Sequence, residues 1–342
     1  MVIYKLSMLQ SKKKSFNQIK IHSQYSICEG ALKIENLKEY CKKNKIQSVG
    51  LSDTYNLSGA LEFSENISSV GTQPIIGSQV QFKFKNTYGL IPLIAKNYNG
   101  YKNIIELSSK AYLENVDNDQ PHCSIEDLTK YSGGIIVLSG AINNLIGNMF
   151  NKGLFEELDE LITILNNNFK ENFYLEIQRH GDKNEKEFEF FNLNISKKYQ
   201  IPIIATNEVY YLDKEMHEAH DALMCIGQKT YINDQKRLKL TNNHYLKSSA
   251  EMDEIFKDLP EALENNYNLP FRCNFRPTPS KPILPKIITD TVNIDDKLKN
   301  DSLKGLEEKF KIDPELISKI SNNIKTKDTY KDRLNHEIKI IT

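Results

Sequence analysis

The sequence predicts an α/β protein in which a mainly parallel sheet is covered by helices. Two observations carry this prediction. Across roughly the first 210 residues, short apolar or alternating runs are followed repeatedly by stretches with helical spacing. One of these helical stretches ends at Gly71, a residue type that commonly stops helices. Repeated strand–helix units build a parallel sheet with the helices outside, and closing that sheet into a barrel would bring the strand ends to one rim.

The expected strands are short and rich in Ile, Val, Phe and Tyr. They cover residues 16–23, 48–52, 74–84 (as one strand or two), 90–95, 135–138, 173–177 and 201–206. Between them, apolar residues recur at spacings of three and four, as in Ile34, Leu37 and Cys41. The helices expected in this part of the chain cover residues 34–45, 58–70, 100–113, 154–165 and 185–199.

Beyond residue 213 helical patterns dominate, with helices expected at 215–226, 249–256, 260–267, 295–310 and 313–341. The stretch 272–286 contains Pro277, Pro279, Pro282 and Pro285, which exclude a helix or a central strand and predict an extended linker. The predicted organisation is a basic extension at 1–15, a barrel domain with a helical C-terminal part at 16–271, the linker at 272–286 and a helical region at 287–342.

Composition excludes some classes of function. The 342 residues include 45 basic and 45 acidic side chains, and this balance argues against a protein that wraps nucleic acid by bulk charge. The lysines at 12–14 could contact DNA, but a solvated basic start, from Met1 or Met8, is preferred. No apolar run is long enough for a membrane helix. Five cysteines without CxxC spacing argue against a disulfide framework and favour the cytoplasm.

Common nucleotide-binding and hydrolase motifs are absent, including the Walker A loop, GxGxxG, GxSxG and HExxH. His217 and His220 could bind a metal, but their spacing is three instead of the four used by metalloproteases, so surface or capping histidines are the preferred interpretation. Residues 117–119 (DND) resemble the start of a calcium loop, but the later glycine and glutamate are missing, and a polar loop is predicted.

Polar residues at the predicted strand ends are more informative. They are His22, Asp53, His180, Asn207 and Glu208. Because the ends of barrel strands meet at one rim, these side chains are expected to converge. Convergent His, Asp and Glu residues are how a hydrolytic metal centre is built, although each residue taken alone is more often a capping or hydrogen-bonding side chain.

The same strand ends resemble the polymerase-and-histidinol-phosphatase (PHP) domain of bacterial replicative DNA polymerase III alpha subunits. The matching segments are residues 21–26 (IHSQYS), 29–31 (EGA), 53–62 (DTYNLSGALE), 73–77 (QPIIG), 93–103 (LIAKNYNGYKN), 173–181 (FYLEIQRHG), 201–212 (IPIIATNEVYYL), 219–226 (AHDALMCI), 236–238 (KRL) and 260–263 (PEAL). The resemblance runs from about residue 16 to the last residue.

The resemblance implies a distorted (βα)7-type barrel followed by a mainly helical extension toward a polymerase palm. In intact members of the family, a rim of His, Asp, Glu and Cys binds up to three metals and can hydrolyse phosphodiesters. The parent enzyme extends primers with deoxynucleoside triphosphates and Mg²⁺. In the family its palm carboxylates lie beyond the point where this chain ends, so the chain is expected to be a fragment, or a split or decayed paralogue, and to be inactive alone.

The family's ligand pattern is broken at five positions. Residues of other types stand where ligands are expected: Lys20 and Thr54 for histidines, Gln79 for a glutamate, Ala141 for a cysteine and Tyr210 for a histidine. The retained ligands are His22, Asp53 and His180, with Glu29 and Glu208 as substitutes. These changes remove donors, and the Lys20 charge repels cations. The resemblance therefore implies a vestigial site without hydrolytic activity, with Zn²⁺ or Mn²⁺ bound only if the site is active.

The expected local role is structural, with docking of the proofreading exonuclease subunit. Other implied partners are primer–template DNA and, through the part that this chain lacks, the sliding clamp; no membrane partner is expected. Two alternatives remain open: an active metal-dependent phosphoesterase or 3'–5' exonuclease, and a stand-alone binding module. The sequence does not identify the docking surface, nor whether residues 287–342 fold alone.

Overall fold

The computed structural model describes residues 14–114, 120–283 and 293–342. The polar loop at 117–119, the lysines at 12 and 13, both candidate start residues and the linker beyond residue 283 lie outside these ranges. The chain divides into two compact units, Met1–Pro279 and Ser280–Thr342.

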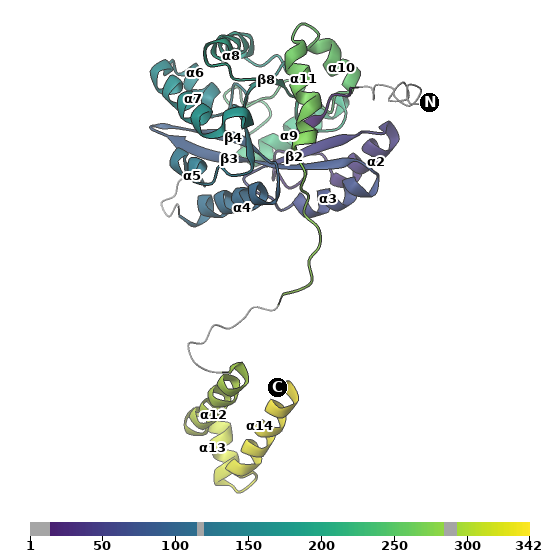
Figure 1. Cartoon of the computed structure of the whole chain (residues 1–342). Helices are drawn as coiled ribbons and strands as arrows, with labels where there is room; N and C mark the ends of the chain where they lie inside the picture. The colour runs from purple at the N-terminus through teal and green to yellow at the C-terminus, as the bar shows by residue number, and fades with distance from the viewer. Residues whose placement is uncertain (1–13, 115–119, 284–292) are drawn as a thin grey trace, which may run out of the picture. The chain divides into compact units, whose positions relative to one another are not determined.

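The first unit is built on a sheet of nine strands, and Figure 1 shows helices lying around it. In chain order the strands are β1 (Gln18–Ile21), β2 (Ser48–Thr54), β3 (Gln73–Phe84), β4 (Thr87–Ala95), β5 (Cys123–Ser124), β6 (Ile135–Leu138), β7 (Phe173–Ile177), β8 (Ile203–Ala205) and β9 (Glu208–Val209). Their order across the sheet is β8-β7-β6-β4-β3-β2-β1-β9, with β5 paired to β3.

Most neighbouring strands are parallel, as the sequence predicts, but β4 runs antiparallel to both β3 and β6. The reason is the short connection between β3 and β4. Only two residues separate Phe84 from Thr87, and such a connection can join only antiparallel strands. One of the two, Lys85, has a φ of 51°, the left-handed conformation that tight hairpins use. The sheet is therefore mixed.

The sheet path begins and ends on one segment of chain. β8 pairs with β7 at one end of the path, and β9 pairs with β1 at the other. Only Thr206 and Asn207 separate β8 from β9. The sheet therefore curls round on itself, which confirms the predicted distorted barrel.

Helices fill the connections between strands. They are α2 (Ile34–Asn44), α3 (Ala60–Ser69), α4 (Tyr98–Leu113), α5 (Ile125–Lys130), α6 (Leu145–Asn151), α7 (Phe155–Phe169), α8 (Glu185–Tyr199), α9 (His217–Gln228), α10 (Ser249–Ile255) and α11 (Pro260–Asn268). Short 3-10 turns are η1 (Lys170–Asn172), η2 (Lys214–Met216) and η3 (Leu269–Arg272). β6, β7 and α8 have the predicted bounds, whereas α5 and α6 were not predicted.

The inside of the barrel changes from apolar to polar along the strands. One cluster of buried side chains comes from six strands and η3, and contains Ile19, Ile75, Ile94, Ile136, Leu138, Tyr174, Ile204, Leu269 and Cys273. Two residues further along β7, Glu176 follows Tyr174, and two residues beyond Ile204 comes Thr206. Since alternate residues of a strand share a face, the same inner faces carry the polar site.

A pairing irregularity in β1 accounts for the position of Lys20. Ile19 belongs to the inner cluster, whereas Ile21 packs in a separate cluster with α2 and α3, and the register of β1 against β2 shifts between Gln18 and Ile21. Irregularities of this kind re-aim side chains. A Cβ at Gly50 would lie 2.7 Å from Ile19 Cα, so the close approach of β2 at this point requires glycine.

The second unit contains α12 (Ile294–Ile312), α13 (Pro314–Ser321) and α14 (Lys327–Ile341). The prediction of one helical stretch over 313–341 is wrong, since the chain turns between α13 and α14, with Asn323 at a φ of 55°. Thr326 then caps α14 by accepting a hydrogen bond from the Thr329 N–H. Among the described residues, no helix combines the length and apolar character needed to cross a membrane.

Candidate functional site: buried polar clusters at the strand ends

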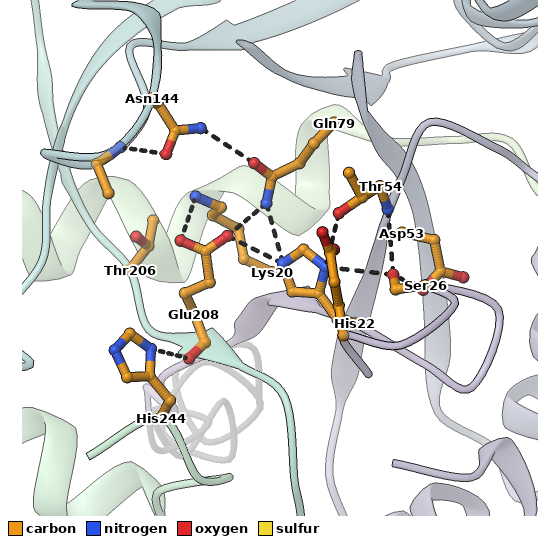
Figure 2. Close-up of polar contacts among 12 residues, drawn as sticks. Lys20, His22, Ser26, Asp53, Thr54, Gln79, Asn144, Thr206, Glu208 and His244 are labelled. Carbon is orange, nitrogen blue, oxygen red and sulfur yellow. Dashed lines mark hydrogen bonds and ion pairs between the residues drawn. The ribbon is translucent and has the colours of Figure 1, made fainter. Parts of the chain in front are cut away.

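The ends of the strands carry a buried network centred on Glu208 of β9. Its Oε2 lies 3.3 Å from Lys20 Nζ of β1, and the same ammonium lies 3.0 Å from Oε1 of Glu176 in β7. Figure 2 shows the Lys20 and Glu208 side chains pointing toward one another. Gln178 and Thr206 donate further hydrogen bonds to Glu176 Oε1. One buried lysine is therefore shared by two buried carboxylates.

His22 connects this ion pair to the neighbouring strands. Its Nε2 lies 2.9 Å from Glu208 Oε1 and 3.0 Å from Gln79 Nε2, and the Gln79 amide also donates to Glu208 Oε1. Gln79 Oε1 accepts from Asn144 Nδ2 at 3.0 Å, and Asn144 Oδ1 accepts from the Ala141 N–H at 3.2 Å. A chain of hydrogen bonds thus runs from Glu208 to Asn144 and Ala141, just before α6 (Figure 2).

Asp53 forms a separate set of contacts near His22. Its carboxylate accepts from the Ser23 N–H at 2.7 Å and from the hydroxyls of Ser23 and Ser26 at 2.8 Å each. Ser26 Oγ accepts from the Thr54 N–H and lies 3.3 Å from His22 Nδ1, as does Thr54 Oγ1. Burial raises the pKa of Asp53, and these hydrogen bonds oppose the rise. Three donors already bind this carboxylate, which is typical of a structural aspartate.

Tyr210 and Glu29 take no part in a ligand arrangement. The Tyr210 ring stacks on His22, with 4.3 Å between ring centroids. Burial, followed by the Glu208 charge, raises the pKa of Tyr210 well above its usual value, so its hydroxyl keeps its proton at neutral pH. Glu29 is partly exposed. Its backbone oxygen accepts from His220 Nε2 at 2.7 Å, and within the described residues its carboxylate forms no hydrogen bond to the network.

His217 and His220 do not share a ligand site. His220 is engaged by the backbone of Glu29, and His217 Nδ1 lies 3.3 Å from the Tyr211 hydroxyl. Neither histidine belongs to a group of three metal-ligand side chains in the part of the chain that the structure covers.

A second polar cluster lies on the backbone side of Glu208. The rings of His180 and His244 stack, with 4.0 Å between centroids and 7° between planes. His244 Nδ1 lies 3.3 Å from the Glu208 carbonyl oxygen (Figure 2), and the Glu208 N–H approaches His180 Nε2 at 3.2 Å. Asp182 Oδ2 lies 3.6 Å from His244 Nε2. The backbone of one residue thus connects this cluster to the carboxylate network.

The electrostatics of the network favour its charged form. Burial alone would lower the pKa of Lys20, but the attraction of Glu176 and Glu208 outweighs it and leaves the pKa raised. Burial alone would raise the pKa of Glu208, but Lys20, His22 and Gln79 hold it well below its usual range. Lys20 and Glu208 are therefore an ion pair at neutral pH.

The residues at this rim do not fit a multinuclear metal centre. Lys20 is 0% exposed, and its ammonium already contacts both nearby carboxylates. Thr54 and Gln79 use their side chains in hydrogen bonds with His22 or its partners, and Ala141 has no donor atom. A metal ion here would meet a fixed positive charge and few free donors. We therefore assign no metal chemistry to the rim network.

The structure groups the predicted site residues unevenly. It joins Lys20, His22, Gln79 and Glu208 directly, and it links Asp53 and Thr54 to them through His22 and Ser26. His180 contacts Asn207 Oδ1 and the backbone of Glu208, but not the Glu208 carboxylate. Sequence reasoning missed Glu176, Asn144, Asp182, His244 and Lys247. For Glu176 a signal was available, because it is an acidic residue inside a predicted buried strand, where a charge needs a partner.

Known proteins share sequence or fold with this chain. Residues 18–180 match the PHP domain family. The DNA polymerase III subunit alpha of Rickettsia conorii is 35% identical over 333 residues, covering 95% of this chain and 28% of that protein. The Borreliella burgdorferi subunit is 35% identical over 347 residues, covering 97% and 29%. A solved Bifidobacterium adolescentis structure, described as a metal-dependent phosphoesterase, shares 12% identity over 71% of this chain and 96% of that one, with a TM-score of 0.39.

Residues 18–180 therefore form a domain of the PHP family. Over most of its length the chain that carries this domain is similar to DNA polymerase III alpha subunits. It spans less than a third of the length of these relatives.

Proposed function

We propose that this chain is the PHP-domain region of a replicative polymerase of the DNA polymerase III alpha type, and that its PHP domain is a structural and docking module without nuclease activity. The similarity to polymerase subunits over 95% of the chain supports the first part. The second part rests on one observation, the Lys20 ammonium held between Glu176 and Glu208.

A phosphodiesterase of this fold needs cations to polarise the phosphate and activate water. At this rim the positive charge belongs to a lysine, which cannot supply a metal-bound hydroxide. The network is instead suited to holding strands together, because Lys20, Glu176 and Glu208 join β1, β7 and β9. β1 and β7 flank the segment on which the sheet path closes, and β9 belongs to that segment. The geometry therefore supports a role in stability.

For the whole protein we propose DNA-directed DNA synthesis from a primer, with Mg²⁺ as the cofactor and with nucleotide transfer located outside these 342 residues. The proposed partners are primer–template DNA, the sliding clamp and the proofreading exonuclease subunit, with the PHP unit as the docking site for the exonuclease. The proposed location is the cytoplasm, where a bacterial chromosome is copied.

A nuclease assay tests the proposed loss of activity. The full chain is incubated with a 3'-labelled single-stranded oligonucleotide and Mn²⁺ or Zn²⁺, beside the variant His22→Ala. We expect no release of nucleotides above a protein-free control for either protein. Release by the unsubstituted chain that disappears in His22→Ala would show an active phosphodiesterase and overturn the proposal.

Docking is tested separately, by mixing the full chain with the proofreading exonuclease subunit of the same organism and measuring a complex by size-exclusion chromatography. A complex formed with the chain supports the docking role. If none forms, and residues 280–342 plus the remainder of the polymerase bind the subunit instead, the docking role is wrong.

A further inference from the structure

Two buried imidazole nitrogens lack hydrogen-bond partners in the described part of the chain. They are His180 Nδ1 and His244 Nε2, on side chains whose residues are 1% and 3% exposed. Leaving a buried polar atom unpaired is unfavourable. Two such atoms lie on stacked rings whose centroids are 4.0 Å apart. We therefore expect a bound ligand beside them.

The hydrogen bonds of the other ring nitrogens fix which atoms carry lone pairs. His244 Nδ1 faces the Glu208 carbonyl at 3.3 Å, and a carbonyl only accepts, so Nδ1 carries the proton and Nε2 the lone pair. Asn207 Oδ1 is fixed as the oxygen, because the Asn207 amide nitrogen donates to two other oxygens, Gln18 Oε1 and the Tyr245 carbonyl oxygen.

His180 Nε2 is therefore assigned as the donor to Asn207 Oδ1, at 3.0 Å. The Glu208 N–H donates to the same nitrogen at 3.2 Å only in the other tautomer, and binding of a metal at Nδ1 selects the tautomer with the proton on Nε2. With the proton on Nε2, the lone pair of His180 lies on Nδ1, the unpartnered atom.

Asp182 supplies a third donor. Its Oδ2 lies 3.6 Å from His244 Nε2, which is too long for a hydrogen bond. Two ligand atoms that each lie about 2.0–2.1 Å from a tetrahedral ion are roughly 3.3 Å apart. Ligand atoms of His180, Asp182 and His244 all lie within 4.8 Å of one another, and no other group of three was found among the described residues.

We propose that His180, Asp182 and His244 bind one Zn²⁺ ion, with water in the fourth position, and that the ion ties the loop after β7 to the segment before α10. Two imidazoles and a carboxylate are an established zinc donor set. The other nitrogen of each histidine is held by a hydrogen bond, as is usual for metal ligands. Only His180 belongs to the rim pattern of the PHP family, so this site is distinct from it.

Nearby charges and access are compatible with a cation. Glu185 Oε1 lies 3.6 Å from His180 Nδ1 and adds negative charge. Lys247 Nζ, which lies 2.9 Å from Asn207 Oδ1, adds a positive charge that partly offsets this negative charge. Asp182 and Glu185 both line a cavity of about 820 Å³ along α8, which gives an ion a route from solvent.

The test is Zn²⁺ binding by the EDTA-stripped full chain, measured by calorimetry and by the visible absorption of Co²⁺ in place of zinc. Asp182→Asn keeps the size of the side chain and removes the charged donor, and His244→Asn removes one imidazole. Controls are His22→Asn, in the rim network, and His336→Ala, an exposed histidine of the second unit.

We expect one ion per chain, an affinity at least about tenfold lower in Asp182→Asn and His244→Asn, and no change in either control. Zn²⁺ should also raise the melting temperature of the unsubstituted chain but not of Asp182→Asn. If His244→Asn fails to fold, Asp182→Asn decides alone, because Asp182 is only partly buried.

Failure to bind one ion, or equal affinity in the chain and Asp182→Asn, would overturn the inference. Loss of binding in His22→Asn but not in Asp182→Asn would place the ion at the rim and would also overturn the inference. The proposed function fails on a different readout, nuclease activity, so the two failures are distinguishable.

Discussion

Lys20 Nζ lies 3.0 Å from Glu176 Oε1, and neither side chain is more than 1% exposed. The two residues come from β1 and β7, which are far apart along the chain. A buried ion pair often adds little net stability over a hydrophobic pair, but removing one partner leaves an uncompensated charge.

Replacing Lys20 with methionine should destabilise the fold by about 3–5 kcal/mol, because Glu176 and Glu208 would lose their shared cation. Urea unfolding at pH 7 measures the change. Lys198→Met is the control, since the Lys198–Asp159 pair is 57% and 43% exposed and should change stability by less than about 1 kcal/mol. Similar losses in both variants would show that Lys20 is not compensating buried charge.

Gln79→Glu should also destabilise the fold, by about 2–4 kcal/mol at pH 7, because it removes a donor to Glu208 and adds a like charge beside it. Gln79→Met, which loses the hydrogen bond without adding charge, should cost less. Unfolding by urea at pH 7 and pH 5 separates the two effects, since partial protonation at pH 5 should narrow the difference between the variants. Stabilisation of Gln79→Glu by Mn²⁺ would contradict our conclusion that the rim network does not suit a metal ion.

Glu208 should make the fold sensitive to acid. Its folded-state pKa is depressed, so its contribution is present above the unfolded-state pKa of about 4.3 and is lost as the pH falls toward the folded-state pKa. Stability should therefore fall more steeply between pH 5 and pH 3 in the unsubstituted chain than in Glu208→Gln. Glu254→Gln, at a 71% exposed carboxylate, is the control and should leave the slope unchanged. Equal slopes in all three proteins would refute the prediction.

Lys247 should make folding stability depend on pH in the alkaline range. Burial lowers its pKa to about 8, below the unfolded value of about 10.4, so stability rises as the pH passes from 8 toward 10.4. The buried thiols of Cys41, Cys123 and Cys273, whose pKa burial raises to about 12, pull the other way. The measurement therefore compares the free energies of unfolding of the two proteins. Between pH 8 and pH 9.5, the stability of the unsubstituted chain relative to Lys247→Met should rise by about 2 kcal/mol. A constant difference would show that Lys247 titrates normally.

Limited trypsin digestion should cut first near the boundary of the two units. Trypsin does not cut the Lys281–Pro282 bond, so the first cleavable lysine beyond the end of the first unit is Lys286, which Ile287 follows. Mass spectrometry of early time points should show a fragment ending at Lys286 or later, before cuts appear within the barrel strands. Earlier cleavage inside the first unit would contradict this order.

The sequence predicts local structure better than it predicts contacts between distant residues. The bounds of β6, β7 and α8 follow from runs of apolar residues and from helical spacing, because those signals lie within one element. The antiparallel direction of β4 depends on a two-residue hairpin that apolar runs do not mark. Lys20 reaches Glu176 from a strand with irregular pairing, and irregular pairing is a tertiary feature without a sequence signature.

The second cluster was harder to predict for a similar reason. His244 lies in a segment with little regular structure, between α9 and α10, and no motif connects it to His180. Both rings also contact the backbone of Glu208, through its N–H and its carbonyl oxygen respectively. His180 could be selected from its position after a strand, whereas its partner could not.

The segment that carries β8 and β9 is the seam of the barrel, and it is also where both polar clusters meet. The Glu208 side chain belongs to the carboxylate network, and its backbone holds the two imidazoles. A shift of this seam would therefore disturb both clusters at once. Substitutions in one cluster are constrained by the other, so the two are expected to have changed together during the history of the domain.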